Sequence, residues 1–388
     1  MTVGTLLNLA LTDDQTIEVK AETCKREWFR QSDCQMCSEI CPEHAITFDL
    51  GPNISEECSS CGLCINICPT ETFQYNWDLP QYFQDHMQHI YKASGSQADE
   101  FLEVHCQQAQ AGSEQSLAIN CLGNVNENLI LASALIGFKG LELSSGYCAQ
   151  CQLAAGKALC ESAMQKARAL IDAVRKDPFL LQLNERQKGS NTEEKLTRRS
   201  FFTRIKKNIR QKTLPADYVK QHPLHELLKS ASSEQTSNTK NIDKHRSAKR
   251  DTLIRILKEH NLNQTNKTIH LPHWKKMQVE QEKCVACAIC VNVCPTGALI
   301  KEIKDNKLYR YYSSATCNNC GVCEEACPHK IIHFVEHYKL DDIIEEQVQL
   351  VARVELTSCF ICGETIPVSE GKICTTCEKR QLSPVFLN

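Results

Sequence analysis

The chain has 388 residues, of which 25 are cysteine and 42% are hydrophobic, and its formal net charge is −3. This length predicts about two to four domains rather than one large core. The near-neutral charge excludes an overall electrostatic attraction to nucleic acid or to a membrane, so any such attraction must be local. Most of the cysteines stand in tight C-x2-C groups, which favour metal binding over a disulfide framework.

The N-terminal stretch MTVGTLLNLALTDDQ is a poor secretory signal, because it lacks a positive n-region and its apolar run soon meets Asp13. No apolar run approaches the roughly 18 residues of a transmembrane helix. A thiol-rich chain that is not exported is expected in the reducing cytoplasm, where cysteines bind metal, react or lie buried.

Residues 24–75 contain two cysteine clusters, and each ends in Cys-Pro and precedes a short β-like run, AITF or TFQY. The second cluster is complete and reads Cys58-x2-Cys61-x2-Cys64-x3-Cys68-Pro69. The first reads Cys34-x2-Cys37-x3-Cys41-Pro42, and Gln31 stands where one more cysteine is expected. Residues 284–335 repeat this arrangement, so the chain contains the same small module twice.

Residues 101–176 differ from the cysteine modules because strand-like and helix-like stretches alternate. FLEVHC, SLAINC and GLELSSGYC predict strands, whereas residues 126–138 and 152–174 have helical periodicity. This alternation predicts a small α/β domain. The gap after Cys106 is short for a parallel crossover, so the order and direction of the first strand stay open.

Four cysteines of this domain follow predicted strands and could converge at the carboxyl edge of the sheet. The stretch CLGNVNENLILASALIGFKGLELSSGYCAQC resembles the iron–sulfur delta subunit of methyl-viologen-reducing hydrogenases, although the chain departs from that family after Cys151. The resemblance implies a [2Fe–2S] cluster on Cys106, Cys121, Cys148 and Cys151. A redox dithiol at Cys148 and Cys151, or cysteines kept for packing, are the alternatives. Cys160 is interpreted as a small core residue.

Residues 177–270 are polar, and SASSEQTSNTKN at 230–241 has the composition of a linker. The stretch KLTRRSFFTRIKKNIRQK at 195–212 is basic, and its apolar residues recur at helical spacing. It predicts a basic amphipathic helix, and the favoured interpretation is a solvated helix with a basic face. Docking on an acidic partner or on a membrane surface is the less favoured alternative. Its arginine pair has no hydrophobic h-region after it, so we do not expect an export signal.

The C-terminal module holds two complete motifs: Cys284-x2-Cys287-x2-Cys290-x3-Cys294-Pro295 and Cys317-x2-Cys320-x2-Cys323-x3-Cys327-Pro328. Three closely spaced thiolates can face one Fe–S cube, while the cysteine before proline points toward the neighbouring cube. These motifs resemble the bacterial-type dicluster ferredoxin family over about 50 residues of each repeat. The resemblance implies a βαββαβ fold around two [4Fe–4S] clusters and the transfer of single electrons.

The crossed arrangement assigns ligand sets in both modules. In the C-terminal module the sets are Cys284, Cys287, Cys290 with Cys327, and Cys317, Cys320, Cys323 with Cys294. In the N-terminal module one set is Cys58, Cys61, Cys64 with Cys41. The remaining set contains Cys34, Cys37 and Cys68, and it lacks a fourth thiolate.

Cys24 is the candidate for this missing ligand. It lies ten residues before Cys34 instead of three, so the loop between the two ligands is seven residues longer than usual. A longer loop costs little closure entropy, because each doubling of its length adds only about 0.6 kcal/mol. We therefore expect Cys24 to complete the set. A three-cysteine [3Fe–4S] or unusual cluster, and a site without a cluster, are the alternatives.

The tail contains Cys359-x2-Cys362 and, after eleven intervening residues, Cys374-x2-Cys377. Two such knuckles suit four thiolates around zinc, as in zinc ribbons, and the same ligands would permit a rubredoxin-like single iron. Each group lacks a third cysteine and a following proline, which argues against another cubane.

The sequence as a whole predicts an α+β fold. Its expected units are dicluster ferredoxin-like modules at 1–100 and 271–340, the α/β domain at 101–176, the linker with its basic helix at 177–270, and a helix with a zinc-ribbon-like tail at 341–388. No hydrolase triad, P-loop or dinucleotide fingerprint is present, so we expect an electron carrier rather than an enzyme.

About four [4Fe–4S] clusters would suit an accessory electron-relay subunit of a larger oxidoreductase. By analogy, the expected partner is a hydrogenase or a formate dehydrogenase-like enzyme. The alternative is an assembly, docking or redox-sensing protein that uses the zinc ribbon and the basic helix.

Overall fold

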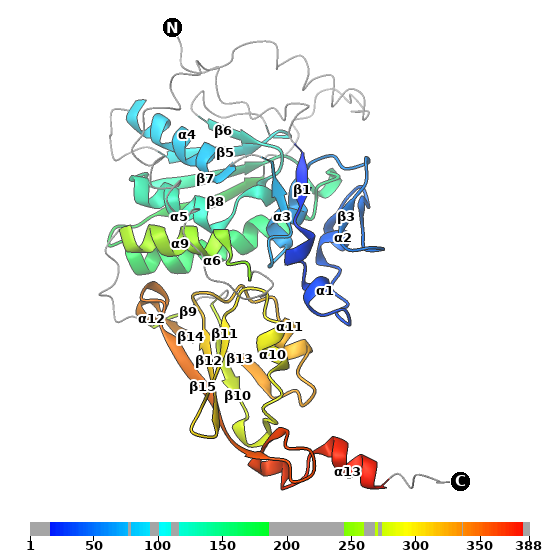
Figure 1. The fold of residues 1–388 in the computed structure, drawn as a ribbon. Coiled ribbons are helices and arrows are strands. Elements are labelled where there is room, and N and C mark those ends of the chain that lie inside the picture. Colours follow the sequence, from blue (N-terminus) through cyan, green and yellow to red (C-terminus); the bar gives the residue numbers. More distant parts are fainter. Residues whose placement is uncertain are drawn as a thin grey trace.

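The structure is a computed structural model. It describes residues 16–76, 79–93, 101–109, 116–185, 244–259, 268–270, 274–335 and 337–382. The predicted basic helix at 195–212 and the linker at 230–241 lie outside these described residues. Within them, no helix combines the length and the apolar character needed to cross a membrane. The chain forms two lobes, with the N-terminal module and the middle domain in one and the C-terminal module in the other (Figure 1).

The N-terminal module closes on itself because its first and last strands pair. Strand β1 (Ile17–Val19) is antiparallel to β4 (Phe73–Tyr75), with Glu18 opposite Gln74. The short strands β2 (Ile46–Thr47) and β3 (Asn53–Ile54) also pair. The helices are α1 (Lys25–Trp28), α2 (Met36–Ile40) and α3 (Leu63–Ile67). The small apolar core includes Phe73, Ile46 and the buried thiols of Cys37 and Cys64.

The middle domain is a parallel four-stranded sheet in the order β6-β5-β7-β8. Strands β5 (Phe101–Cys106), β6 (Ser116–Ile119) and β7 (Gly140–Ser145) confirm the three expected strands and settle the direction of the first. Strand β8 (Leu180–Glu185) extends the sheet beyond the expected boundary at residue 176, because it pairs with β7.

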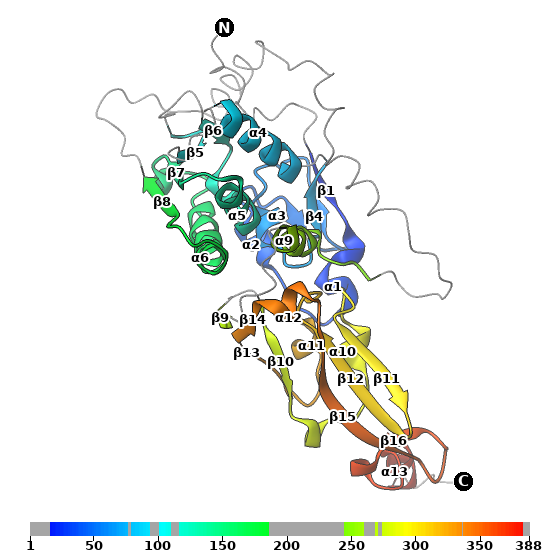
Figure 2. The same ribbon diagram turned by 90° about the vertical axis from the view of Figure 1, so that its left-hand side faces the viewer.

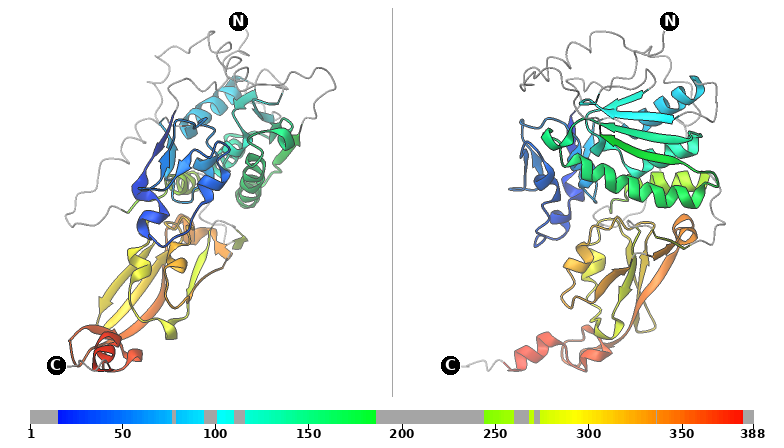
Figure 3. Two further views of the ribbon diagram at one scale, coloured as in Figure 1. Left: turned by 90° about the vertical axis from the view of Figure 1, so that its right-hand side faces the viewer. Right: turned by 180° about the vertical axis from the view of Figure 1, so that it is seen from behind.

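Helices flank this sheet and bury its apolar side chains. Helix α5 (Glu127–Ile136) begins at Asn126, whose side chain accepts a hydrogen bond from the Leu129 amide at 3.0 Å. Helix α6 (Gly156–Val174) packs beside α5, so both expected helices are confirmed (Figure 3). Helices α4 (Leu79–Ala93) and α9 (Ala248–Glu259) also contact or lie beside α5 (Figure 2). Helix α9 comes from the range expected to be a linker.

The C-terminal module repeats the closure of the N-terminal one. Strand β10 (Lys276–Val279) is antiparallel to β13 (Ile332–Val335), and two short helices, α10 (Ile289–Asn292) and α11 (Val322–Glu325), follow cysteine loops. This module contains a long hairpin where the N-terminal module has only β2 and β3. The hairpin consists of β11 (Leu299–Lys304) and β12 (Lys307–Ser313), joined through Asp305 and Asn306 at positive φ.

The tail is joined to this hairpin by continuous strand pairing. Strand β15 (Val348–Ser358) pairs with β12 and then with β16 (Thr365–Pro367), which gives a sheet in the order β11-β12-β15-β16. Helix α13 (Thr375–Leu382) ends the described tail. Nearer the other lobe, β9 (Thr268–His270) pairs with β14 (His337–Lys339), and α12 (Leu340–Ile344) joins the core of the middle domain. The fold is therefore mixed α and β in both lobes.

Candidate iron–sulfur and metal sites

The cysteine loops share a backbone pattern that the sequence does not display directly. In three of these loops, two residues have positive φ. One lies just before the second cysteine, and the other lies just after it. These residues are Ser60 and Gly62, Ala286 and Ala288, and Asn319 and Gly321. The turns aim amides inward, so that Ser60 N lies 3.4 Å from Cys58 Sγ and Asn319 N lies 3.4 Å from Cys317 Sγ. Such amide-lined concave loops favour anionic sulfur.

A second turn follows each Cys-Pro pair. The third residue after each of these cysteines has positive φ; these residues are His44, Glu71, Gly297 and Lys330. In the N-terminal module the turn brings the next amide back to the sulfur, with Ala45 N 3.4 Å from Cys41 Sγ and Thr72 N 3.5 Å from Cys68 Sγ. These bonds hold the fourth sulfur of each motif in place.

Site A is defined as Cys24, Cys34, Cys37 and Cys68, the set with the displaced first ligand. Burial raises the pKa of Cys24, and the nearby thiols of Cys68 and Cys34 raise it further. Burial raises the pKa of Cys37 to about 12, with Cys68, Cys34 and Cys24 adding to the effect. The structure thus brings Cys24 into the set, and the short helix α1 lies within the extended loop. That these four residues hold a cluster stays a prediction.

Site B is defined as Cys41, Cys58, Cys61 and Cys64. Burial raises the pKa of Cys61, and Cys41 and Cys58 raise it further. Burial raises the pKa of Cys64 in the same way, with contributions from Cys61, Cys58 and Cys41, and also from Cys37 of site A. The crossing expected from the motif is therefore present, since Cys41 of the first motif lies with the cysteines of the second.

The middle-domain set, site C, is Cys106, Cys121, Cys148 and Cys151. All four line one small pocket at the carboxyl end of the sheet. Backbone amides approach three of the sulfurs: Gly146 N lies 3.2 Å from Cys106 Sγ, Gly123 N 3.3 Å from Cys121 Sγ, and Leu153 N 3.4 Å from Cys151 Sγ. Burial raises the pKa of Cys121 to about 12, with contributions from the other three thiols. The structure thus brings the four thiols of site C together, and that they hold a cluster stays a prediction.

The C-terminal module brings together two further sets. Site D is Cys284, Cys287, Cys290 and Cys327, and site E is Cys294, Cys317, Cys320 and Cys323. Burial raises the pKa of Cys290 to about 11 against the opposing charge of Arg310, and the other three thiols of site D lie near it. Burial also raises the pKa of Cys323, which has the other thiols of site E and Cys290 of site D as neighbours. The cysteine before proline in each motif therefore again lies with the cysteines of the other motif.

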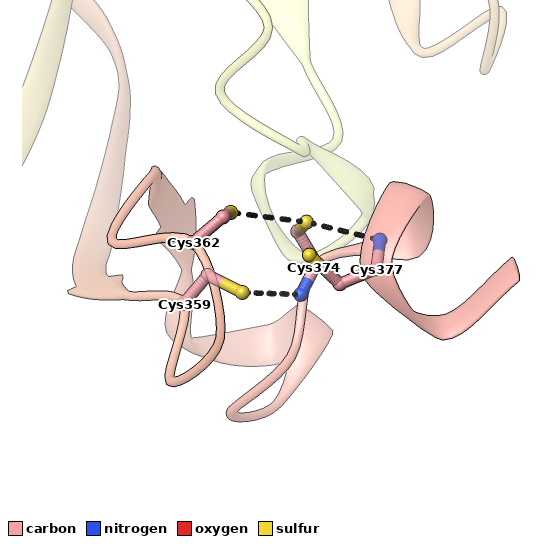
Figure 4. A group of neighbouring side chains, drawn as sticks. All are labelled: Cys359, Cys362, Cys374 and Cys377. Atoms are coloured by element: carbon pink, nitrogen blue, oxygen red, sulfur yellow. Dashed lines mark hydrogen bonds between the residues drawn. The ribbon is translucent and has the colours of Figure 1, made fainter. Parts of the chain in front are cut away.

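The tail site is Cys359, Cys362, Cys374 and Cys377, and its ligand atoms all lie within 4.8 Å of one another. Cys362 Sγ and Cys374 Sγ are 3.7 Å apart, and Figure 4 shows how the four side chains face one another. A tetrahedral zinc with Zn–S bonds of about 2.3 Å places its sulfurs about 3.8 Å apart, so the residues fit a single ion. Amide donors lower the pKa of Cys359 to about 6, which favours a metal-binding thiolate.

The spacing of sulfurs separates the tail from the other sites. Among the described residues, the tail is the one group of three or more metal-ligating side chains whose ligand atoms all lie within 4.8 Å. At sites A, B, C, D and E, no three of the ligand sulfurs all lie within 4.8 Å of one another. This difference fits an ion in the tail and larger inorganic cores in the modules.

The first joint between sites connects the N-terminal module to the middle domain. Asn124 Nδ2 donates to Cys61 O at 2.8 Å, and Asn66 Nδ2 donates to Gly123 O at 2.7 Å. Burial raises the pKa of the Tyr75 phenol, which has thiols of site B and Cys121 of site C as neighbours. Sites B and C are therefore adjacent across a closely packed joint.

The second joint connects the two modules through the extended loop of site A. Lys25 forms an ion pair with Glu325, and Ser32 Oγ lies 3.3 Å from the same carboxylate. The Phe29 ring packs against the apolar cluster formed by Val293, Val322 and Ala326, which also includes Cys320 of site E. Together with the shared neighbours within each module, the joints place the sites in the order C, B, A, E, D.

Some residues that act around the cysteines could not be identified from the motifs. Tyr75 and Asn124 belong to no motif, because their role depends on the packing of two domains. Arg310 has a weak signal, since it alternates with Leu308 and Tyr312 on the inward face of β12. A charged residue at such a position calls for a buried partner of opposite charge.

Two stretches match known families. Residues 283–332 match the family described as a 4Fe-4S dicluster domain, and residues 31–76 match the LdpA Fe-S cluster-binding domain. The second match begins after Cys24, so it leaves the role of that residue as a prediction.

Similar proteins include a ferredoxin and subunits of larger enzymes. Pyruvate synthase subunit PorD of Methanothermobacter marburgensis is 32% identical over 84 residues, which are 21% of this chain and cover 91% of that subunit. An uncharacterized ferredoxin of Methanocaldococcus jannaschii is 42% identical over 50 residues, 13% of this chain and 65% of that protein. NAD(P)H-quinone oxidoreductase subunit I of Gloeobacter violaceus is 33% identical over 72 residues, 17% of this chain and 34% of that subunit.

The matched motifs and the coverage of the PorD subunit define the class of the protein. The chain belongs to the iron–sulfur ferredoxin family with 4Fe-4S dicluster domains. It nevertheless spans only between about a third and two thirds of the Gloeobacter and Methanocaldococcus relatives.

Proposed function

We propose that the protein is an electron-relay subunit that carries four [4Fe–4S] clusters, at sites A, B, D and E, and works with a larger oxidoreductase. The observation that carries this proposal is the crossed grouping of sixteen thiols, four in each of these sites. The named enzymes among the relatives support the oxidoreductase context. The chain itself would not catalyse substrate chemistry.

The residues around each site suit this task. A [4Fe–4S] cluster, when bound, takes up and releases one electron without a change in covalent bonding. More than half of the module thiols are buried, which limits the access of water, and inward amides stabilise negative charge on sulfur. The short joints between neighbouring sites keep the relay continuous from the middle domain to the C-terminal module. Electron transfer therefore needs pre-arranged thiols and amides around each site and no catalytic acid or base.

The remaining two cysteine sets are assigned separate roles. We propose that site C binds a [2Fe–2S] cluster and is the end of the relay in the middle domain, supported by four convergent thiols and three amide–sulfur contacts. A redox dithiol at Cys148 and Cys151 is the alternative. The tail site is proposed to bind structural zinc, supported by its single-ion spacing.

We also propose a class of partner and a cellular compartment. A redox enzyme such as a hydrogenase or a formate dehydrogenase-like enzyme would supply or receive the electrons. The cytoplasm is the proposed compartment, because its reducing conditions keep thiols available for metal binding.

Electron counting tests the proposed function. Anaerobically purified full-length protein is titrated with dithionite and then reoxidised. We expect a reversible uptake of about four electrons per chain from the modules, and about five if site C also takes one. Replacing one thiol of a module site, as in Cys61→Ala, should lower the uptake by about one electron. Cys160→Ala is the control for the module sites, because Cys160 is buried in α6 and lines the site C pocket, outside every module site. Uptake below one electron would contradict the proposal.

A docking or redox-sensing role is the second candidate, and the position of the tail favours it. The tail site lies at the far tip of the C-terminal lobe (Figure 1). Cys374→Ala should release zinc and weaken capture of an oxidoreductase partner without lowering electron uptake. If module variants that lack clusters bind the same partner and support its full activity, the docking role replaces the relay.

A further inference from the structure

Arg310 is a buried cation without a carboxylate partner. It lies on β12, its exposed fraction is 3%, and its Nε and Nη2 atoms have no hydrogen-bond partner among the described residues. Its remaining nitrogen, Nη1, lies 3.3 Å from Cys284 Sγ of site D. A guanidinium is charged at all ordinary pH values, so it cannot escape burial by losing its proton.

The strand geometry explains how this side chain reaches site D. Alternation along β12 places Leu308, Arg310 and Tyr312 on the buried face. The pairing of β12 with β15 shifts register between Arg310 and Tyr311, and an irregularity of this kind re-aims the adjacent side chain. The hairpin thus delivers a positive charge to a position where the core would otherwise be apolar.

Burial of an unpaired charge is costly unless an opposite charge is close. At Arg310, the described surroundings supply thiols of site D and no ion pair. A cluster held by four thiolates is anionic, and reduction adds another negative charge. The burial of the Arg310 guanidinium therefore costs less free energy as negative charge accumulates at site D.

Cations near the other module sites have different surroundings. Lys25, near site E, is already paired with Glu325. Arg250, also near site E, lies 4.0 Å from the centre of the Trp274 ring. Arg26, near site A, donates to the Cys34 carbonyl at 2.7 Å and lies over Phe48. Arg310 differs from Lys25 and Arg26 because it donates directly to a sulfur of its site.

Resting on the proposed function, we propose that Arg310 raises the reduction potential of site D, so that site D is the first of the four module sites to accept an electron. Electrons that enter through the N-terminal module would then collect in the C-terminal module. The nearby positive charge favours the reduced cluster because it offsets the added negative charge.

Redox titration of the full-length protein followed by EPR tests the inference. In Arg310→Met, the ratio of reduced to oxidised site D at a fixed potential should fall by at least about tenfold, which corresponds to about 59 mV for a one-electron couple. Arg310→Lys keeps the charge and should retain most of the native potential. Arg353→Met is the matched control, because it removes an equal charge from an exposed position on β15.

A second measurement assigns the signal and covers the case in which Arg310→Met loses its cluster. In Cys287→Ala, the signal that disappears should be the one reduced first in the native protein. An unchanged site D potential in an Arg310→Met protein with full iron content would overturn the inference, as would loss of a later signal in Cys287→Ala. Native protein without iron and sulfide would instead overturn the proposed function.

Discussion

The two ferredoxin modules differ less in their cysteines than in what is inserted between them. In the N-terminal module, the extra residues lie between Cys24 and Cys34 and reach the other module through Lys25 and Phe29. In the C-terminal module, the extra residues form the β11–β12 hairpin, which carries Arg310 inward and pairs with β15 outward. One insertion therefore joins the modules, while the other alters a site and supports the tail.

A repeated motif can thus keep its ligand geometry while the residues inserted in each copy make different contacts. In both modules, the third residue after the cysteine of each Cys-Pro pair is left-handed. The loop that carries Lys25 and the hairpin that carries Arg310, in contrast, each occur in one module only. Duplicated sites can in this way become an ordered relay without a change in the motif itself.

The strongest effect is expected at the ligand that distinguishes site A. Cys24→Ala should remove the cluster of site A, which lowers iron by about four atoms per chain relative to the native protein. Iron and acid-labile sulfide analysis of anaerobic protein measures the loss, and Cys160→Ala, which changes a residue of the site C pocket, should retain the iron of the modules. Unchanged iron and sulfide would show that Cys24 is not required.

The joint between sites B and C depends on a glycine. Gly62 has φ +81°, and a Cβ atom there would lie 2.0 Å from the Tyr75 hydroxyl and 2.4 Å from Asn124 Oδ1. Gly62→Ala should lower the free energy of unfolding by about 2–5 kcal/mol, combining left-handed strain with overpacking. The measurement is urea unfolding of anaerobic protein followed by circular dichroism.

A matched glycine in the other module separates these two causes. Gly321 has φ +74°, and a Cβ atom added there would meet no described atom within 4 Å. Gly321→Ala should therefore cost only the strain of about 1–2 kcal/mol. Equal losses in the two variants would contradict the tight joint between sites B and C.

A buried carboxylate links the N-terminal module to helix α9. Glu71 accepts hydrogen bonds from Ser247 Oγ at 2.5 Å, Ala248 N at 2.9 Å and Lys249 N at 3.1 Å, at the start of the helix. Glu71→Ala should destabilise the helix by about 1–3 kcal/mol, because amide donors lose their acceptor. Faster hydrogen exchange in α9 would show this loss, and native exchange rates would refute it.

The weakest effect is expected at the ion pair between the modules. A double-mutant cycle of Lys25→Met and Glu325→Gln should give a coupling of about 0.2–1 kcal/mol, since both side chains are partly exposed and screened. The coupling should decrease at high salt. A coupling of zero would assign the joint to the Phe29 contact instead.

The sequence predicted those features that depend on local spacing. The cysteine grouping followed from the motif and its crossing rule, and three strands of the middle sheet followed from alternating apolar runs. Strand β8 was not predicted, because LLQLNE leads directly into the polar stretch RQKGS and its pairing with β7 depends on tertiary structure.

The surroundings of the sites were less accessible to such reasoning. The order of the sites depends on Gly62, Tyr75 and Asn124, which meet only when two domains pack. The contact of Arg310 with Cys284 depends on a hairpin register that no short motif encodes. The spacing of cysteines thus predicts candidate ligands, whereas the packing of the domains decides which sites are neighbours.

Mössbauer spectroscopy combined with iron and acid-labile sulfide counts, on full-length protein purified without oxygen, decides whether the modules hold their four clusters. We expect about sixteen irons, with matching sulfide, in [4Fe–4S] form in the modules, besides any iron at site C. Protein that contains zinc alone and no labile sulfide would contradict the electron relay.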